Sequence, residues 1–256
     1  AGNENGLESE GVETYVVTGI VGDSQDFYVC DNTKGLEVLG LQGNAQKIIN
    51  FNQVKWGVEF LLEGDGFAKW DELSKADFNP DQSNIGTLNA TFFHPGAPAV
   101  VNINNQGTAL GETSLYTPRP LFIDGININN AVSLTVNVAD GNAIVDDING
   151  DMLTSLTIAA EGDFAVQQSL LTTLTKIDAA GVMGQFNAVL DNMDGAFELL
   201  ASDNGMTLVF NDGFAAAEGT IIDGGAGEDS FIIAENVVVD FTNAALTDID
   251  SVVMQN

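Results

Sequence analysis

The strongest constraint on this chain is a series of short apolar runs, each followed by a tight-turn signal. From about residue 121 onward the runs recur at short intervals, at 121–123, 134–138, 156–158, 186–190, 206–210, 221–222, 231–233, 237–239 and 251–253. Asp-Gly pairs begin at 124, 140, 194 and 212, and Asn-Gly pairs at 149 and 204. Short strands separated by such turns indicate an all-β fold, either a β-sandwich or a stacked β-coil of the β-roll or β-helix type.

The first part of the chain follows a more mixed pattern, which is still mainly β. Residues 12–21 and 26–30 are predicted strands, 45–62 fits both a strand and a helix, and 71–75 fits one or two helical turns. Four of the five prolines fall in residues 94–120, which predicts an extended connector or an edge segment. Short helices remain an alternative at 166–174 and 214–218.

We therefore place a boundary near Pro120. A mainly β domain, 1–120, carries a candidate assembly arm at 1–20, and an acidic turn-rich β domain follows at 121–256. One shared sheet system remains compatible with this division.

Charge excludes several classes of partner. The 256 residues include 37 Asp and Glu but 7 Lys and Arg, giving a formal net charge of −30. So few cations cannot neutralise a nucleic-acid backbone or an anionic lipid surface. No apolar run approaches the length of a membrane-spanning helix, and the N-terminal sequence has no basic or apolar leader pattern, so no membrane insertion is expected.

The acidic residues are concentrated in the C-terminal part. Residues 121–256 contain 21 Asp and Glu against a single cation, Lys176. Such a surface repels itself unless salt or divalent cations screen it. Two interpretations remain open: adaptation to a saline environment, or Ca²⁺ binding by the carboxylates. Both predict that stability depends on ions.

A nine-residue turn motif is the best local signal for a cation. Residues 224–232, GGAGEDSFI, fit the pattern GGxGxDxUx, whose glycines allow a tight turn while Asp229 supplies a hard oxygen ligand. In stacked arrays each ion lies between two such turns that are two nonapeptides apart, and no second copy precedes Gly224 at that spacing. Asp223, Glu228 and Asp229 form either a weak or shared Ca²⁺ site or a Gly-rich structural turn without an ion.

A second acidic cluster has the alternating spacing of a Ca²⁺ loop. Asp147, Asn149 and Asp151 stand at positions i, i+2 and i+4, but Met152 and Ile158 occupy the positions where an EF-hand requires Gly and Glu. The alternative is a solvated turn.

Catalytic residue patterns are scarce, and we expect no enzyme activity. His94 is the single histidine, and no pattern around it indicates a triad. Cys30 is the single cysteine, so an intrachain disulfide is impossible, and its apolar context predicts a buried thiol. Trp56 and Trp70 are expected to be core or interface anchors.

Residues 153–253 resemble the C-terminal regions of bacterial S-layer and repeats-in-toxin surface proteins. The resemblance rests on 153–164 (LTSLTIAAEGDF), 171–186 (LTTLTKIDAAGVMGQF), 219–233 (GTIIDGGAGEDSFII) and 238–253 (VVDFTNAALTDIDSVV). It implies a Ca²⁺-stabilised stacked β-fold, export without a cleaved N-terminal signal, and assembly on the cell surface. It also places the ion site at Asp223, Gly225, Gly227 and Asp229, with one nonapeptide where the arrays have many. Residues 1–152 show no such resemblance.

The expected function is a self-assembling structural protein of an extracellular surface layer or filament, stabilised by Ca²⁺. Its partners would be copies of itself, and the segment 12–20 is a candidate strand for donation to a neighbour through Val12, Tyr15, Val17 and Ile20. A virion structural protein, such as a phage tail-tube, decoration or capsid-associated subunit, is the first alternative. A Ca²⁺-dependent adhesin or glycan-binding module is the second.

Overall fold

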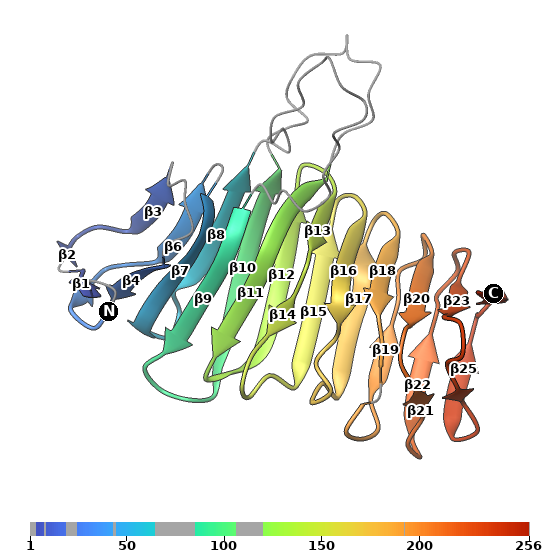
Figure 1. The fold of residues 1–256 in the computed structure, drawn as a ribbon. Coiled ribbons are helices and arrows are strands. Elements are labelled where there is room, and N and C mark those ends of the chain that lie inside the picture. The colour runs from blue at the N-terminus through green and yellow to red at the C-terminus, as the bar shows by residue number, and fades with distance from the viewer. Residues whose placement is uncertain are drawn as a thin grey trace, which may run out of the picture.

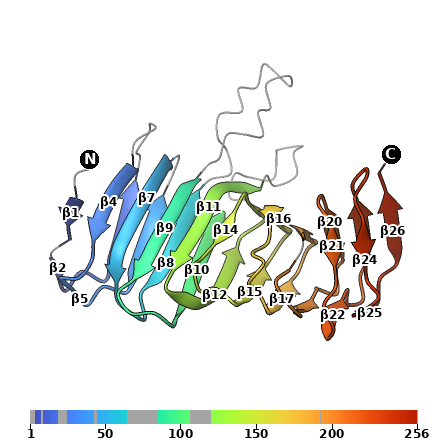
Figure 2. The same ribbon diagram turned by 60° about the horizontal axis from the view of Figure 1, so that its bottom comes forward.

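The chain folds as a stacked coil of parallel β-strands, a β-solenoid (Figure 1). The computed structural model describes residues 4–7, 9–18, 25–42, 45–64, 85–105, 120–191 and 193–255, and no helix occurs among them. The N-terminal strands lie at one end of the stack and the C-terminal strands at the other (Figures 1 and 2). The sequence prediction of an all-β stacked coil is confirmed.

Two large parallel sheets run along the stack. The twelve-stranded sheet has the order β1 (Glu4–Gly6), β4 (Gln25–Val29), β7 (Ala45–Val54), β9 (Ile85–Phe92), β11 (Leu121–Asn129), β13 (Ala143–Val145), β16 (Phe164–Ser169), β18 (Phe186–Val189), β20 (Met206–Phe210), β23 (Ser230–Ile233) and β26 (Ser251–Met254), with β14 (Ile148–Asn149) also pairing with β11. The ten-stranded sheet has the order β25 (Ala244–Thr247), β22 (Thr220–Asp223), β19 (Glu198–Leu200), β17 (Lys176–Val182), β15 (Ser155–Ala160), β12 (Ala131–Ala139), β10 (Ala97–Asn105), β8 (Glu59–Gly64), β6 (Val38–Gln42) and β3 (Thr14–Thr18). Two small sheets pair β2 (Ser9–Glu10) with β5 (Thr33–Lys34), and β21 (Phe214–Ala215) with β24 (Val239–Asp240).

The chain alternates between the two large sheets, so each coil contributes to both. In the C-terminal half, the length of one coil is the sequence distance between two residues that pair in neighbouring coils. Phe186 pairs with Met206 in this way, and Thr220 pairs with Ala244. Equivalent turns of successive coils therefore lie above one another. Side chains that are far apart in the sequence, by one full coil, become neighbours in the fold.

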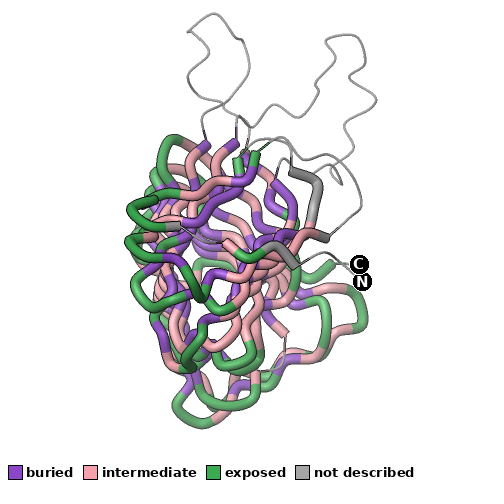
Figure 3. Tube along the Cα trace, turned by 90° about the vertical axis from the view of Figure 1, so that its left-hand side faces the viewer, coloured by how far each residue is buried: buried purple, intermediate pink, exposed green. Residues whose placement is uncertain are grey.

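The core lies between the sheets and runs the length of the stack. Strand residues alternate between buried and half-buried, as in β9 and β10, because successive side chains of a strand point to opposite faces. Seen along the stack, buried residues line the interior and exposed residues lie mostly on the turns (Figure 3). In the C-terminal coils the core is aromatic, with the rings of Phe210, Phe231 and Phe241 packed at centroid distances of 5.1–5.6 Å.

An asparagine ladder ties neighbouring coils together on the outward face of the twelve-stranded sheet. The Asn89 amide Nδ2 donates to Asn50 Oδ1 at 2.9 Å, and Asn127 Nδ2 donates to Asn89 Oδ1 at 2.7 Å. The three residues occupy the same register position in β7, β9 and β11. The two side-chain hydrogen bonds thus join three successive coils, as in stacked amide ladders.

Several local expectations need correction. Residues 45–62, which fitted a strand or a helix, form β7 and most of β8. The helices considered at 166–174 and 214–218 do not form, since these segments contribute to β16 and β21. The Asp124-Gly125 pair lies inside β11 rather than in a turn, and a Cβ at position 125 would come within 3.2 Å of Thr87 Cγ2.

The prediction of a connector or edge segment at 94–120 was wrong for its first part. Residues 97–105 form β10, an inner strand of the ten-stranded sheet paired with both β8 and β12. Pro98 is accommodated because it is exposed near the start of the strand, where the register with β12 shifts. The segment 106–119 lies outside the described residues, as does the expected helical turn at 71–75.

Both large sheets continue past residue 120. Strand β9 pairs with β11, and β10 pairs with β12, so strands from 1–120 and from 121–256 lie in the same two sheets.

Along the described ranges, no helix is long and apolar enough to span a membrane.

Candidate cation site in the C-terminal coils

Three consecutive turns stack at one corner of the last coils. They connect the ten-stranded sheet to the twelve-stranded sheet at 201–205, 224–229 and 248–250. Their alignment follows from strand pairing, because Leu200 pairs with Asp223 and Asp223 with Thr247. The GGxGxD motif therefore forms the middle turn of three.

Glycines let these turns approach one another backbone to backbone. A Cβ at Gly227 would lie 2.1 Å from the backbone nitrogen of Gly205, and one at Gly224 would lie 2.4 Å from the carbonyl oxygen of Asp248. Gly225 has a φ of 83°, which side chains rarely tolerate. The motif's glycines are thus required by the packing of the turns, whether or not an ion is bound.

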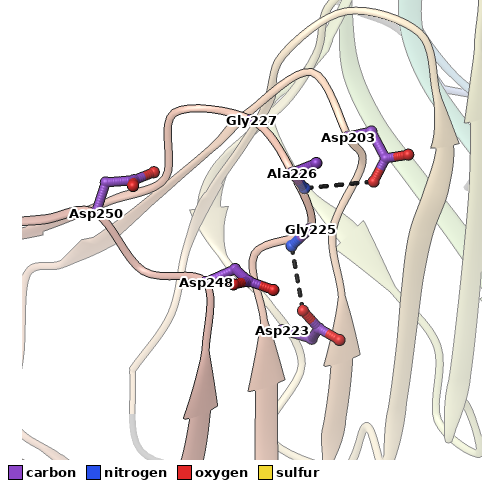
Figure 4. A pocket seen from close by; sticks show the side chains of 7 residues that line it. All are labelled: Asp203, Asp223, Gly225, Ala226, Gly227, Asp248 and Asp250. Carbon is purple, nitrogen blue, oxygen red and sulfur yellow. Dashed lines mark hydrogen bonds between the residues drawn. The ribbon is translucent and has the colours of Figure 1, made fainter.

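Four aspartates line a cavity of about 400 Å³ beside the middle turn: Asp203, Asp223, Asp248 and Asp250 (Figure 4). Three of them accept backbone hydrogen bonds from that turn. The Ala226 amide donates to Asp203 Oδ1 at 3.3 Å, the Gly225 amide to Asp223 Oδ1 at 3.2 Å, and the Asp229 amide to Asp250 Oδ2 at 2.8 Å. The hydrogen bonds link all three turns through carboxylates.

A fifth aspartate, Asp229, is buried beside these four and does not itself line the cavity. Its side chain is 1% exposed, and neither carboxylate oxygen has a hydrogen-bond partner of good geometry within the described ranges. Burial raises its pKa above the ordinary 3.8; the Met206 backbone amide opposes the shift, and the carboxylates of Asp250, Asp248 and Asp223 add to it. A buried carboxyl without a partner is costly, so this position calls for a neutralising group.

The neighbourhood offers oxygen ligands and little positive charge. Lys176 is the one Lys or Arg in residues 121–256, and its ammonium lies 3.3 Å from Asp178 in β17. As the side chains stand, no three acidic, His or Cys side chains in the described part of the chain are arranged to hold one metal ion. Ligation would therefore need rotation of the exposed aspartates or the use of backbone carbonyls.

The sequence-predicted site residues at this corner lie on one turn. Asp223 ends β22, Gly225 and Gly227 shape the turn, and Asp229 precedes β23. Three further aspartates of the cavity were not predicted from the sequence: Asp203, Asp248 and Asp250. The motif suggested a second turn at a distance of two nonapeptides, and that distance is shorter than one coil. The signal for Asp250 is its position 21 residues after Asp229, one coil along the stack.

The second acidic cluster is only partly brought together. The Asn149 amide donates to the Asp147 carboxylate, whereas Asp151 Oδ1 accepts from the Asn130 backbone N–H at 2.6 Å in the neighbouring coil. Burial and the Asp146 carboxylate raise the pKa of Asp147, while hydrogen bonds from Ile148 and Asn149 lower it. In this arrangement Asp151 serves to join two turns.

The predicted assembly residues lie in the first described coils. Tyr15 and Val17 belong to β3, which pairs in parallel with β6 of the same chain, and Val12 precedes it. Val17 is buried, Tyr15 is half-buried and Val12 is exposed. Ile20 lies outside the described residues.

The single cysteine and the single histidine have different surroundings. Cys30 is buried, as expected from its sequence context, and burial followed by the nearby Asp31 carboxylate raises its pKa to about 12. A thiol with that pKa stays protonated near neutral pH and is a poor nucleophile. His94 is exposed on the turn before β10, beside Trp56 and Phe93.

Comparison with protein-family models, with curated proteins and with solved structures found no match to this chain.

Proposed function

We propose that this chain is a structural β-solenoid of an extracellular assembly, a surface layer or a filament, in which Ca²⁺ completes the C-terminal coils. The observation that carries the proposal is Asp229, a buried carboxyl whose oxygens make no hydrogen bond of good geometry in the described ranges, set beside further carboxyls. The proposed ion lies at the stack of turns 201–205, 224–229 and 248–250.

A divalent cation explains the acidic cluster better than a proton does. A proton neutralises Asp229 but leaves the carboxylates of the four lining aspartates repelling one another. A divalent ion would attract all of them at once and, because Asp203, Asp223 and Asp250 belong to successive coils, would hold three coils together. Binding energy gained only in the folded state adds directly to stability.

The available ligands favour Ca²⁺ among biological cations. The cavity is lined by aspartates and by the backbone of residues 225–227, which offer oxygen ligands. Ca²⁺ accepts roughly six to eight oxygen ligands in flexible geometry, whereas Mg²⁺ demands a near-octahedral shell and retains water. Extracellular Ca²⁺-binding modules have dissociation constants of roughly 10⁻⁴–10⁻³ M, and we expect this site to fall in that range.

Assembly with copies of itself is supported by the edge strands and the charge. Strand β26 pairs with β23 on one side, and no strand covers its other side within the described ranges; Val252, Val253 and Met254 are 57%, 48% and 59% exposed. Exposed strand edges readily accept another strand, either from a further coil or from another copy of the chain. Because each copy carries a formal charge of −30, association would require cations to screen the repulsion.

Thermal unfolding in Ca²⁺, in Mg²⁺ and in chelator at equal ionic strength tests the cation site. We expect Ca²⁺ at a hundredfold excess over its dissociation constant to stabilise the protein by about 2.7 kcal/mol, with a smaller effect of Mg²⁺. Asp229→Asn should abolish the Ca²⁺ response, while Glu235→Gln, which removes one charge from an exposed position, should preserve it. Equal responses to both ions, or a full response in Asp229→Asn, would contradict the site.

Analytical sedimentation in the same buffers tests assembly. We expect ordered polymers in Ca²⁺ that dissolve in chelator. A protein that stays monomeric in both buffers while binding Ca²⁺ would refute assembly and leave the cation site standing.

A further inference from the structure

Two large aromatic side chains are exposed on neighbouring turns, each with its ring against His94. Trp56 lies on the turn between β7 and β8, and Phe93 on the turn between β9 and β10; each is 57% exposed. The turns are adjacent because β7 and β9 are paired, with Val54 opposite Phe92 and the Phe93 amide donating to the Val54 carbonyl at 2.9 Å. We call Trp56, Phe93 and the intervening His94 the aromatic platform.

The platform is held in place by its own contacts. The Trp56 indole N–H donates to the His94 carbonyl oxygen at 3.0 Å. The His94 ring lies edge to face with both neighbours, at centroid distances of 6.4 Å from Trp56 and 4.5 Å from Phe93. Because these contacts fix the rings before any ligand arrives, binding would cost little side-chain entropy.

Polar groups border the platform on both sides. Lys55, next to Trp56 on the same turn, donates from its ammonium to the Thr33 carbonyl of the preceding coil. On the following coil the Asn130 amide Nδ2 donates to the Phe92 carbonyl at 2.8 Å, and Asp151 accepts from the Asn130 backbone. An apolar surface with a few fixed polar groups at its rim is the usual construction of a small-ligand site.

We propose that the aromatic platform binds a neutral pyranose saccharide, stacked on Trp56 and Phe93. The negative faces of aromatic rings attract positively polarised groups, and the C–H bonds on the flat side of a sugar ring are of this kind. The surrounding amide, ammonium and carboxylate groups would bind the hydroxyls. This function is additional to the cation site and independent of it.

Size and charge together select this ligand. About half of each aromatic side chain is exposed, which gives roughly 200–280 Å² of apolar surface, far below the roughly 800 Å² per partner of a stable protein interface. The formal charge of −30 opposes uronic-acid and sulfated saccharides. A neutral sugar is small enough and is not repelled.

Calorimetric titration with cellohexaose and with N-acetylchitohexaose, both uncharged, tests the proposal. We expect saturable binding of one or both, weakened roughly tenfold or more by Trp56→Ala and by Phe93→Ala. Trp56→Phe should retain part of the affinity. Met183→Ala, at a residue 70% exposed on a turn of another coil, is the matched control and should bind as the wild type does.

Indole fluorescence gives a second readout that depends on position. In a Trp70→Phe background Trp56 is the single tryptophan, so a saccharide stacked on the platform should shift its emission. Circular dichroism checks that each variant is folded. Failure of both saccharides to bind, undiminished binding by folded Trp56→Ala, or tighter binding of oligogalacturonate than of the neutral sugars would overturn the proposal.

Discussion

At the scale of single residues, the proposed ion dependence rests on Asp229. Its carboxyl is buried against the backbone of Gly224, where a Cβ would lie 2.7 Å from Asp229 Cγ. The sequence singled out this residue, because the GGxGxD motif makes it a candidate cation ligand. Its burial without a hydrogen bond of good geometry could not be predicted, since that depends on the turns before and after it.

The raised pKa of Asp229 has a definite consequence for stability in chelator. A carboxyl whose pKa rises on folding binds its proton more tightly in the folded state, so it favours folding at low pH. This contribution declines as the pH rises from about 3.8 through the folded-state pKa. Asp229→Asn should therefore unfold at nearly the wild-type temperature near pH 3 and a few degrees higher near pH 7.

Melting curves of both proteins across this range measure the difference directly. Glu235→Gln again controls for the loss of one charge. A variant that is less stable than the wild type near neutral pH in chelator would mean that the Asp229 charge is already compensated within the fold.

At the scale of elements, hydrophobic alternation predicted most strands but not their partners. The runs at 134–138, 156–158 and 206–210 fall inside β12, β15 and β20. Prolines misled the prediction at 94–120, because one proline near the start of a strand is tolerated where the register shifts. The length of a coil was not predicted, and therefore three aspartates of the site were missed.

The turn glycines should be as sensitive as core residues. Gly227→Ala would place its Cβ 2.1 Å from the Gly205 nitrogen, so two coils must separate. We expect a loss of about 1–3 kcal/mol, typical of overpacking in a well-packed region. Gly195→Ala, where a Cβ meets nothing within 4 Å and φ is not positive, should change stability little.

Chemical denaturation of the two glycine variants provides the comparison. Equal stabilities would show that turns 201–205 and 224–229 do not approach each other as closely as described. Loss of stability in Gly227→Ala alone would support the turn packing on which the cation site depends.

At the scale of the whole molecule, the stack joins the two sequence regions through the same pair of sheets. Composition predicted an acidic, folded, β-rich protein, and the solenoid explains how such a chain is held together: each coil covers the core of the next. Nearest-neighbour stacking makes stability local, so an ion at one corner should act mainly on the coils that it touches. The aromatic platform could not be predicted from the sequence, where Trp56 was expected to be a core or interface anchor, because it depends on which turns become neighbours.

Hydrogen exchange measured in Ca²⁺ and in chelator tests the central claim most directly, because it resolves the coils separately. We expect Ca²⁺ to slow exchange in the six strands next to the three turns, β19, β20, β22, β23, β25 and β26, while β9 to β12 exchange at nearly the same rate in both buffers. In Asp229→Asn the two buffers should give the same pattern. Protection by Ca²⁺ that is spread evenly over all coils, or absent from the C-terminal ones, would contradict a cation bound at turns 201–205, 224–229 and 248–250.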